Sequence, residues 1–386
     1  KGNYYQVYQK NPKVSLTEHS ITASCQNEVQ EQLKSFDQVD LANPMSTDED
    51  VLLKFELVRC GQQRSILRWK IHHAISDGQS QDILTTELKS LLNSKINSQP
   101  VSLREISSNY RGFSQWQHSA DFAKKTSEQG LYWKKKFTVP HIHSKIGMRP
   151  DALHIGAGNY YARSYTYDLQ RWTACAKSSR VSLFSLILSA FFVVIRKLYS
   201  SDDVVLRTVT SGRTLQDFTP LNGLFFCPVY LRQELSSVSS WNELMSNTQN
   251  EIIEVTTNQD YPIHMLLKDL NIEITNSVYP LTNIMINYHN FGNQKSSNSN
   301  LLRAIDGHGT LGMDLRVDLT LLLKHFGDSM TLQLDYRAEL FTETQIEEVM
   351  AALEICLDSL CMDPGCDFSS ILPQFCPELM SRIKVL

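Results

Sequence analysis

The residues whose types and spacing suggest chemistry are two adjacent histidines, His72 and His73, followed by Asp77 and Gly78. A histidine side chain can accept or donate a proton near neutral pH, and the backbone of a glycine can approach a reacting group closely. On composition alone, the pattern H-H-x-x-x-D-G should occur by chance in well under ~1 chain in 1,000. The spacing therefore carries weight as a motif.

The motif lies where an alternating strand gives way to a helix. Residues 51–58 and 64–73 alternate between apolar and polar side chains on either side of a turn signal, which predicts a β-hairpin. Extending the alternation to the end of the second strand puts His73 on the apolar face and His72 on the polar face. We therefore expect the second histidine, and not the first, to point into the protein.

The pattern changes to a helical period after Gly78, with an apolar stripe that ends near Asn93. Asp77 lies where the N-cap of this helix is expected, because a carboxylate there accepts backbone N–H bonds. Gly78 is either a simple turn glycine or a residue whose N–H donates a hydrogen bond to an oxyanion. The residues themselves leave both alternatives open.

Length and periodicity predict two lobes. A chain of 386 residues exceeds one ordinary core, and strands and helices mingle in both halves without a repeat. Residues 138–160 show poor periodicity and are the predicted linker, so we expect lobes at 1–160 and 161–386. The second half predicts strands near 161–167, 204–209, 284–288, 315–325 and 330–336, and helices near 169–179, 183–198, 241–256, 262–270 and after Thr342.

Composition excludes several classes of protein. Lys and Arg number 37 against 41 acidic residues, with no basic block, so the charge footprint of a nucleic-acid binder is missing. The most hydrophobic run, residues 183–195, is shorter than the ~20 residues of a membrane span. The eight cysteines include no CxxC pair, so we expect reduced thiols and no metal site. The chain has no signal-type opening, and we expect a cytoplasmic protein that is an excerpt of a longer one.

Together with its neighbouring segments, the motif resembles the condensation domain of nonribosomal peptide synthetases, within the wider chloramphenicol-acetyltransferase-like acyltransferases. The resemblance covers nearly the whole chain, because further segments occur in the family's order. These are GFSQWQ at 112–117, LYWKKKF at 131–137, the run from Ser182 to Arg213 that ends in SGR, NGLFFCPVYLR at 222–232, NQDYPIHMLLKDL at 258–270 and YPLTNIMINYHN at 279–290.

The chain also departs from this family. The family's opening segment has no counterpart before Lys1, and Cys227 and Pro228 stand where an Asn-Thr pair is usual. Residues 79–81, Gln-Ser-Gln, differ from the segment that follows the motif in epimerisation domains. The intact histidines differ from the aspartate motif of heterocyclisation domains. These departures argue against both subtypes.

The resemblance implies a fold and a reaction. The fold is α/β with mixed sheets, arranged as two chloramphenicol-acetyltransferase-like lobes in a V around a central tunnel. The reaction is amide bond formation between an acyl or peptidyl thioester donor and an aminoacyl acceptor, both bound to carrier proteins. The implied partners are the upstream and downstream carrier domains of the same megasynthase. Their phosphopantetheine arms deliver the substrates, so no cofactor, metal or nucleotide of the domain's own is implied.

The same resemblance assigns roles to the motif. His73 is the candidate catalytic residue, either as the base that takes the proton of the amine or as a group that positions it, and Gly78 is the candidate oxyanion donor. His72, Asp77 and Arg213 are expected to be structural at the active site. By resemblance, Asp77 pairs with Arg213 at the end of the Ser-Gly-Arg turn.

Two rival functions stay open at this point. A related acyltransferase could use a soluble or intramolecular nucleophile, as in variants that close a ring or release a chain. A non-catalytic domain could instead recruit a carrier protein or a partner enzyme. The intact motif counts against the second rival, whereas Cys227 and the missing opening segment count slightly for it.

Overall fold

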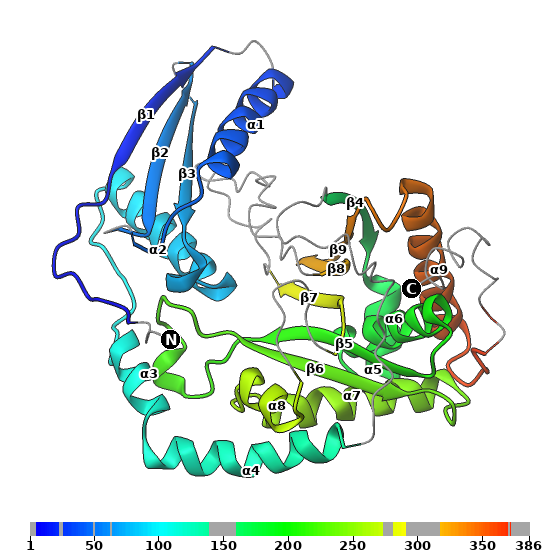
Figure 1. The fold of residues 1–386 in the computed structure, drawn as a ribbon. Coiled ribbons are helices and arrows are strands. Elements are labelled where there is room, and N and C mark those ends of the chain that lie inside the picture. The colour runs from blue at the N-terminus through cyan, green and yellow to red at the C-terminus, as the bar shows by residue number, and fades with distance from the viewer. Residues whose placement is uncertain are drawn as a thin grey trace. The chain divides into compact units, whose positions relative to one another are not determined.

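The computed structural model describes the chain as two compact units (Figure 1). The described residues are 5–22, 26–48, 51–61, 64–138, 160–272, 281–290, 317–369 and 371. The first unit holds those up to Tyr110 together with Leu215–Phe225, and the second holds Arg111–Thr214 and those from Phe226 onward. The linker expected at 138–160 lies almost wholly outside the described residues, so the division at residue 160 stays a prediction.

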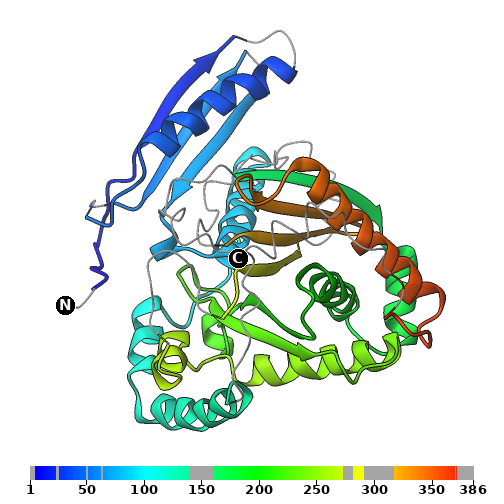
Figure 2. The same cartoon turned by 45° about the vertical axis from the view of Figure 1, so that its right-hand side comes forward.

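A three-stranded sheet forms the body of the first unit, in the order β1-β2-β3. Its elements are β1 (Leu16–Ile21), α1 (Gln26–Ala42), β2 (Leu53–Cys60), β3 (Arg64–Ile71), the 3-10 turn η1 (His73–Ile75) and α2 (Gly78–Ile96). β1 and β2 run parallel, and β2 and β3 form the expected antiparallel hairpin. α1 lies across one face of this sheet (Figure 2), where Val29 joins Val58 and Ile66 in a small buried core.

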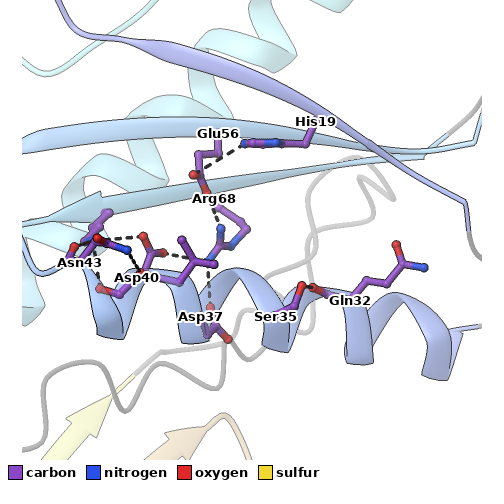
Figure 3. Close-up of polar contacts among 10 residues, drawn as sticks. His19, Gln32, Ser35, Asp37, Asp40, Asn43, Glu56 and Arg68 are labelled. Atoms are coloured by element: carbon purple, nitrogen blue, oxygen red, sulfur yellow. Dashed lines mark hydrogen bonds and ion pairs between the residues drawn. The ribbon is translucent and has the colours of Figure 1, made fainter.

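Charged side chains hold α1 against the sheet (Figure 3). Arg68 on β3 donates to Asp37 at 2.8 Å and to Asp40 at 3.0 Å, both on α1, and it also contacts Glu56 on β2. Its guanidinium lies over the ring of Phe36, 5.1 Å from the centroid. The Arg68 side chain is only 15% exposed, so this network is partly withdrawn from water. α1 therefore depends on ion pairs as well as on its small apolar core.

The face of the hairpin that α1 covers is not the face that the alternation predicted. The expected apolar face, with Trp69 and Ile71, is half-buried, whereas the buried residues Val58 and Ile66 lie on the opposite face. β3 also ends at Ile71, so the alternation does not reach His73, which begins a 3-10 turn and has an exposed side chain. The expectation that His73 points into the protein is therefore wrong, because the strand ends before it.

A six-stranded mixed sheet forms the body of the second unit. Its strands are β4 (Tyr160–Asp168), β5 (Asp203–Thr210), β6 (Cys227–Glu234), β7 (Ile284–Asn290), β8 (Leu319–Phe326) and β9 (Ser329–Arg337), in the order β4-β9-β8-β7-β5-β6. β7 is parallel to β5 and β8, and the other pairings are antiparallel. Pro228 has no N–H to donate, and it lies on β6 at an edge of the sheet, where a missing donor is tolerated.

Helices accompany this sheet, and those after residue 169 lie where the periodicity predicts them. They are α3 (Tyr110–Gln117), α4 (Ala120–Lys136), α5 (Gln170–Ser178), α6 (Leu183–Tyr199), α7 (Trp241–Thr257), α8 (Ile263–Asp269) and α9 (Glu343–Met362), with a further 3-10 turn η2 (Gln216–Phe218) in the first unit. α6 is apolar almost all round and lies buried with α7 and α9 beside it (Figure 2). The capping box of Thr342 and Gln345 at the start of α9 is confirmed.

No single helix in the described part of the chain is long and apolar enough to cross a membrane. α5 and α6 together pass the same test of length and composition, but they are bent by 96° at the break between them.

Replacing Arg68 tests whether the ion network holds α1. Arg68→Met leaves the carboxylates of Asp37, Asp40 and Glu56 without their shared cation, which should weaken the docking of α1 by about 2 kcal/mol, less than for a fully buried pair. Hydrogen exchange of the α1 amides in the full chain should then be roughly 30-fold faster. Arg59→Met is the matched control, because Arg59 pairs with Glu18 at the surface, where both side chains are about half exposed. Equal exchange in the two variants would contradict the prediction.

Candidate active site

The histidine motif occupies the short connection between β3 and α2. His72 precedes the 3-10 turn that His73 begins, and Asp77 precedes the helix that Gly78 begins. The strand fixes one end of this connection and the helix fixes the other. The imidazole of His73 and the first backbone N–H groups of α2 are therefore carried on one short, ordered stretch of chain.

The two histidines use the same ring nitrogen in opposite ways. His72 Nδ1 accepts the backbone N–H of Ala74 at 3.0 Å, so this nitrogen carries no proton and neutral His72 is protonated on Nε2. His73 Nδ1 lies 2.6 Å from the carbonyl oxygen of Ser76. Because a carbonyl oxygen can only accept, His73 Nδ1 must donate. Neutral His73 therefore has its lone pair on Nε2, the nitrogen that can take a proton from a substrate.

Burial separates the two histidines further. His72 is half-buried, and its hydrogen bond to Ala74 caps the 3-10 turn, which supports the structural role expected for it. His73 is the more exposed of the two. The more exposed histidine is thus the one whose neutral form has its lone pair on Nε2.

Asp77 is confirmed as the N-cap of α2, and its carboxylate bonds to more than the helix. Oδ1 accepts the backbone N–H and the hydroxyl of Ser80, each at 2.8 Å. Oδ2 accepts the backbone N–H of Phe225 at 2.9 Å. Asp77 is only 4% exposed, and a carboxylate withdrawn from water requires hydrogen-bond donors of this kind. These contacts support a structural role for Asp77.

Gly78 is the first residue of α2 and is exposed. The first N–H groups of a helix have no acceptor within the helix, and they carry the positive end of the helix dipole. The N–H of Gly78 is therefore suited to bind a developing oxyanion close to the turn that carries His73. Its role as oxyanion donor stays a prediction.

Arg213 lies at the end of the expected Ser-Gly-Arg turn, directly after β5. Gly212 has a φ of +65°, a left-handed conformation that favours glycine over residues with side chains. The Arg213 side chain is buried, and its Nη1 donates to the carbonyl of Ser211 at 3.4 Å. Arg213 belongs to the second unit and Asp77 to the first, so the pairing of the two stays a prediction.

Residues 223–225 complete the surroundings of Asp77, and their contacts with the motif were not predicted. Ser80 Oγ accepts the N–H of Gly223 at 3.0 Å and lies 2.9 Å from its carbonyl oxygen, and Tyr110 Oη donates to the carbonyl of Leu224 at 2.8 Å. These residues all belong to the first unit. Because Ser80 and Gly223 are 143 positions apart and the contact joins a side chain to the backbone, no local pattern signals it.

A cysteine nucleophile is disfavoured at Cys227, where the family usually has asparagine. Burial raises the pKa of the Cys227 thiol to about 12, Asp260 adds to the effect, and Lys125 opposes it. The thiol therefore stays protonated at neutral pH, whereas a nucleophile must be a thiolate. Within the described ranges, no group of three or more His, Cys, Asp or Glu residues could hold a metal ion.

A sequence model of the condensation domain matches residues 1–373, and the chain belongs to this family, which occurs in nonribosomal peptide synthetases. It is 26% identical over 336 residues to a linear gramicidin synthase of Brevibacillus parabrevis, across 86% of this chain and 6% of that protein. The chain thus spans a small fraction of such synthases.

Solved structures show the fold. The starter condensation domain of rhizomide synthetase, crystallised as a mutant with C8-CoA, aligns with a TM-score of 0.76 at 14% identity, over 94% of this chain and 81% of that one. The X-domain from teicoplanin biosynthesis aligns with a TM-score of 0.73 at 16% identity, over 95% and 83%. The expected α/β fold with mixed sheets, of the chloramphenicol-acetyltransferase-like type, is confirmed.

A double-mutant cycle tests the expected ion pair. Asp77→Asn and Arg213→Gln each remove one charge, and each should speed hydrogen exchange of residues 72–80. If the two side chains pair, the double variant should exchange little faster than the worse single variant, a coupling of roughly 1–3 kcal/mol. Arg171→Gln is the control, because Arg171 forms an exposed pair with Asp358 elsewhere in the second unit. Additive effects of the two substitutions would show that the pairing is wrong.

Proposed function

We propose that the chain forms amide bonds between two carrier-bound thioesters, with His73 as the residue that takes or orients the proton of the attacking amine. The observation that carries the proposal is the hydrogen bond from His73 Nδ1 to the carbonyl of Ser76. It leaves the lone pair on Nε2 of an exposed imidazole, in a family whose members are parts of peptide synthetases. Positioned histidines of this kind are the most common protein bases.

The bonds and protons of the reaction balance with the groups present. The amine nitrogen of the acceptor attacks the thioester carbon of the donor, and the carbonyl oxygen takes the electron pair. Collapse of this tetrahedral species re-forms the carbonyl and breaks the carbon–sulfur bond, which releases the thiol of the donor arm. His73 Nε2 accepts the proton that nitrogen loses and can return it to the departing sulfur. The N–H of Gly78 donates to the oxygen while it is negatively charged.

The substrates would arrive on the phosphopantetheine arms of an upstream and a downstream carrier domain. The relatives of this chain are long synthases, and a related domain occupies part of a four-domain nonribosomal peptide synthetase solved in its holo form. The proposal requires no nucleotide or metal at the site, because the energy for bond formation is stored in the thioester of the donor.

A second function has one observation in its favour. The X-domain from teicoplanin biosynthesis, which shares this fold, has also been solved in complex with OxyB. A domain of this shape can therefore serve as a docking platform for another protein. A recruiting role for this chain would make the arrangement of His73 and Gly78 unnecessary, and that arrangement is intact here. We therefore favour catalysis.

The decisive assay follows acyl transfer by mass spectrometry with a panel of acyl and aminoacyl carrier thioesters. His73→Ala should lower condensed product by roughly 10²–10⁴-fold, the usual contribution of acid–base help. His118→Ala is the matched control, because His118 Nδ1 also bonds to a backbone carbonyl, that of Ser114 at 2.7 Å, but lies outside the motif. It should leave the rate unchanged.

Three other outcomes would overturn parts of the proposal. Equal product from wild type and His73→Ala would remove His73 from the mechanism. Carrier binding by both proteins without any product would favour the recruiting role. Product that forms with free amines or alcohols, but not with a carrier-bound acceptor, would identify an acyltransferase for soluble nucleophiles.

A further inference from the structure

The first turn of α2 is fastened to a segment from a distant part of the sequence, Leu215–Phe225, which belongs to the same compact unit. Ser80 lies at the centre of the attachment. Its Oγ accepts the N–H of Gly223 at 3.0 Å and lies within hydrogen-bond distance of Asp77 Oδ1, at 2.8 Å, and of the Gly223 carbonyl, at 2.9 Å. The hydroxyl thus touches both the cap of α2 and the segment.

A second bond runs alongside the first. Asp77 Oδ2 accepts the N–H of Phe225 at 2.9 Å, so the carboxylate that caps α2 also binds the segment. Gln79 on the same helical turn donates its amide to the carbonyl of Thr219 at 3.1 Å. Ser80 and Asp77 are both buried, so water does not compete well for their bonds. The segment is therefore held at several points by one turn of helix.

Packing leaves the segment little freedom. The ring of Tyr110 meets that of Phe225 edge-on, with centroids 5.1 Å apart, and its hydroxyl donates to the carbonyl of Leu224. A Cβ added at Gly223 would overlap the Tyr110 ring and come within 2.9 Å of Phe225. The glycine therefore permits the close approach that brings its N–H to Ser80.

This attachment bears on the turn that carries His73. The carbonyl that fixes the His73 tautomer belongs to Ser76, the residue directly before Asp77. A shift of Asp77 would move that carbonyl, because the two residues share a peptide bond. Ser76 itself is buried, and Gln81 on α2 donates weakly to its hydroxyl at 3.5 Å.

We propose that Ser80 is a positioning residue for the reaction at His73. Its hydroxyl binds Leu215–Phe225 to the first turn of α2, an attachment that we call the clasp. The clasp keeps the carbonyl of Ser76 in the position where it accepts the hydrogen bond from the His73 imidazole. This inference rests on the proposed function for its catalytic consequence, although the clasp is a structural feature that can be tested without turnover. A purely structural Ser80 would stabilise the unit without changing the rate of the folded enzyme.

The test compares Ser80→Ala with Ser189→Ala in the full chain. Both remove a buried serine hydroxyl from a helix, but Ser189 bonds to the carbonyl of Ser185 in α6, in the second unit. In Ser80→Ala, hydrogen exchange of Gly223 and Phe225 should be roughly 5–10-fold faster, as expected for one lost hydrogen bond. The kcat for condensation should fall by a similar factor or more at unchanged KM for the carrier substrates. Ser189→Ala should do neither.

A second variant changes the partner of Ser80, Gly223, and leaves Ser80 itself intact. Gly223→Ala should push the segment away from Ser80 through the clash with Tyr110, and it should give the same two changes. Unchanged exchange in both variants would show that there is no clasp, whatever the activity. Faster exchange with kcat equal to that of Ser189→Ala would leave Ser80 structural and overturn its positioning role. A wild type that makes no product would overturn the proposed function and the positioning role together, while the exchange data would still decide the clasp.

Discussion

The buried carboxylate of Asp77 is the constraint on which this site depends. A charge withdrawn from water must be met by donors, and here the donors include the backbone and hydroxyl of Ser80 and the backbone of Phe225. The Asp77 carboxylate therefore caps α2 and also binds the segment Leu215–Phe225, which is distant in the sequence. Because Asp77 is held in place, the end of the turn formed by residues 73–76 is held in place as well.

The consequence for chemistry is a difference between two neighbouring histidines. His72 receives a backbone N–H and becomes a cap, whereas His73 donates to a backbone carbonyl and keeps its Nε2 lone pair. A backbone N–H makes this distinction at His72, and a backbone carbonyl makes it at His73. Together with the positive end of α2 at Gly78, it places the proposed base and the proposed oxyanion donor on one short connection.

Features set by local pattern could be read from the sequence. The hairpin, the Asp77 cap, the buried helix α6 and the capping box at Thr342 all follow from periodicity or from single turns. α1 was not predicted: its apolar stripe of Val29, Leu33 and Phe36 is short, and the ion pairs of Arg68 with Asp37 and Asp40 that also hold it are not signalled by the sequence. These contacts become visible only when the chain is folded.

The orientation of His73 was predicted wrongly for a related reason. The prediction requires the strand's alternation of side chains to continue to residue 73. β3 ends at Ile71, however, and the 3-10 turn that follows changes the direction in which the next side chains point. The contact of Ser80 with Gly223 could not be predicted at all, because it joins a side chain to the backbone of a segment 143 residues away. The residues of the motif were identifiable, but what holds them was not.

The most direct test of this account is the tautomer of His73, observed by nitrogen NMR on protein labelled at its histidines and assigned by comparison with His73→Ala. The spectra are recorded at a pH at which the nitrogen shifts themselves show that the ring is neutral. The account predicts a proton on Nδ1 and a lone pair on Nε2. A neutral ring with its proton on Nε2 would contradict it, because the nitrogen assigned to take the proton of the amine would already carry one.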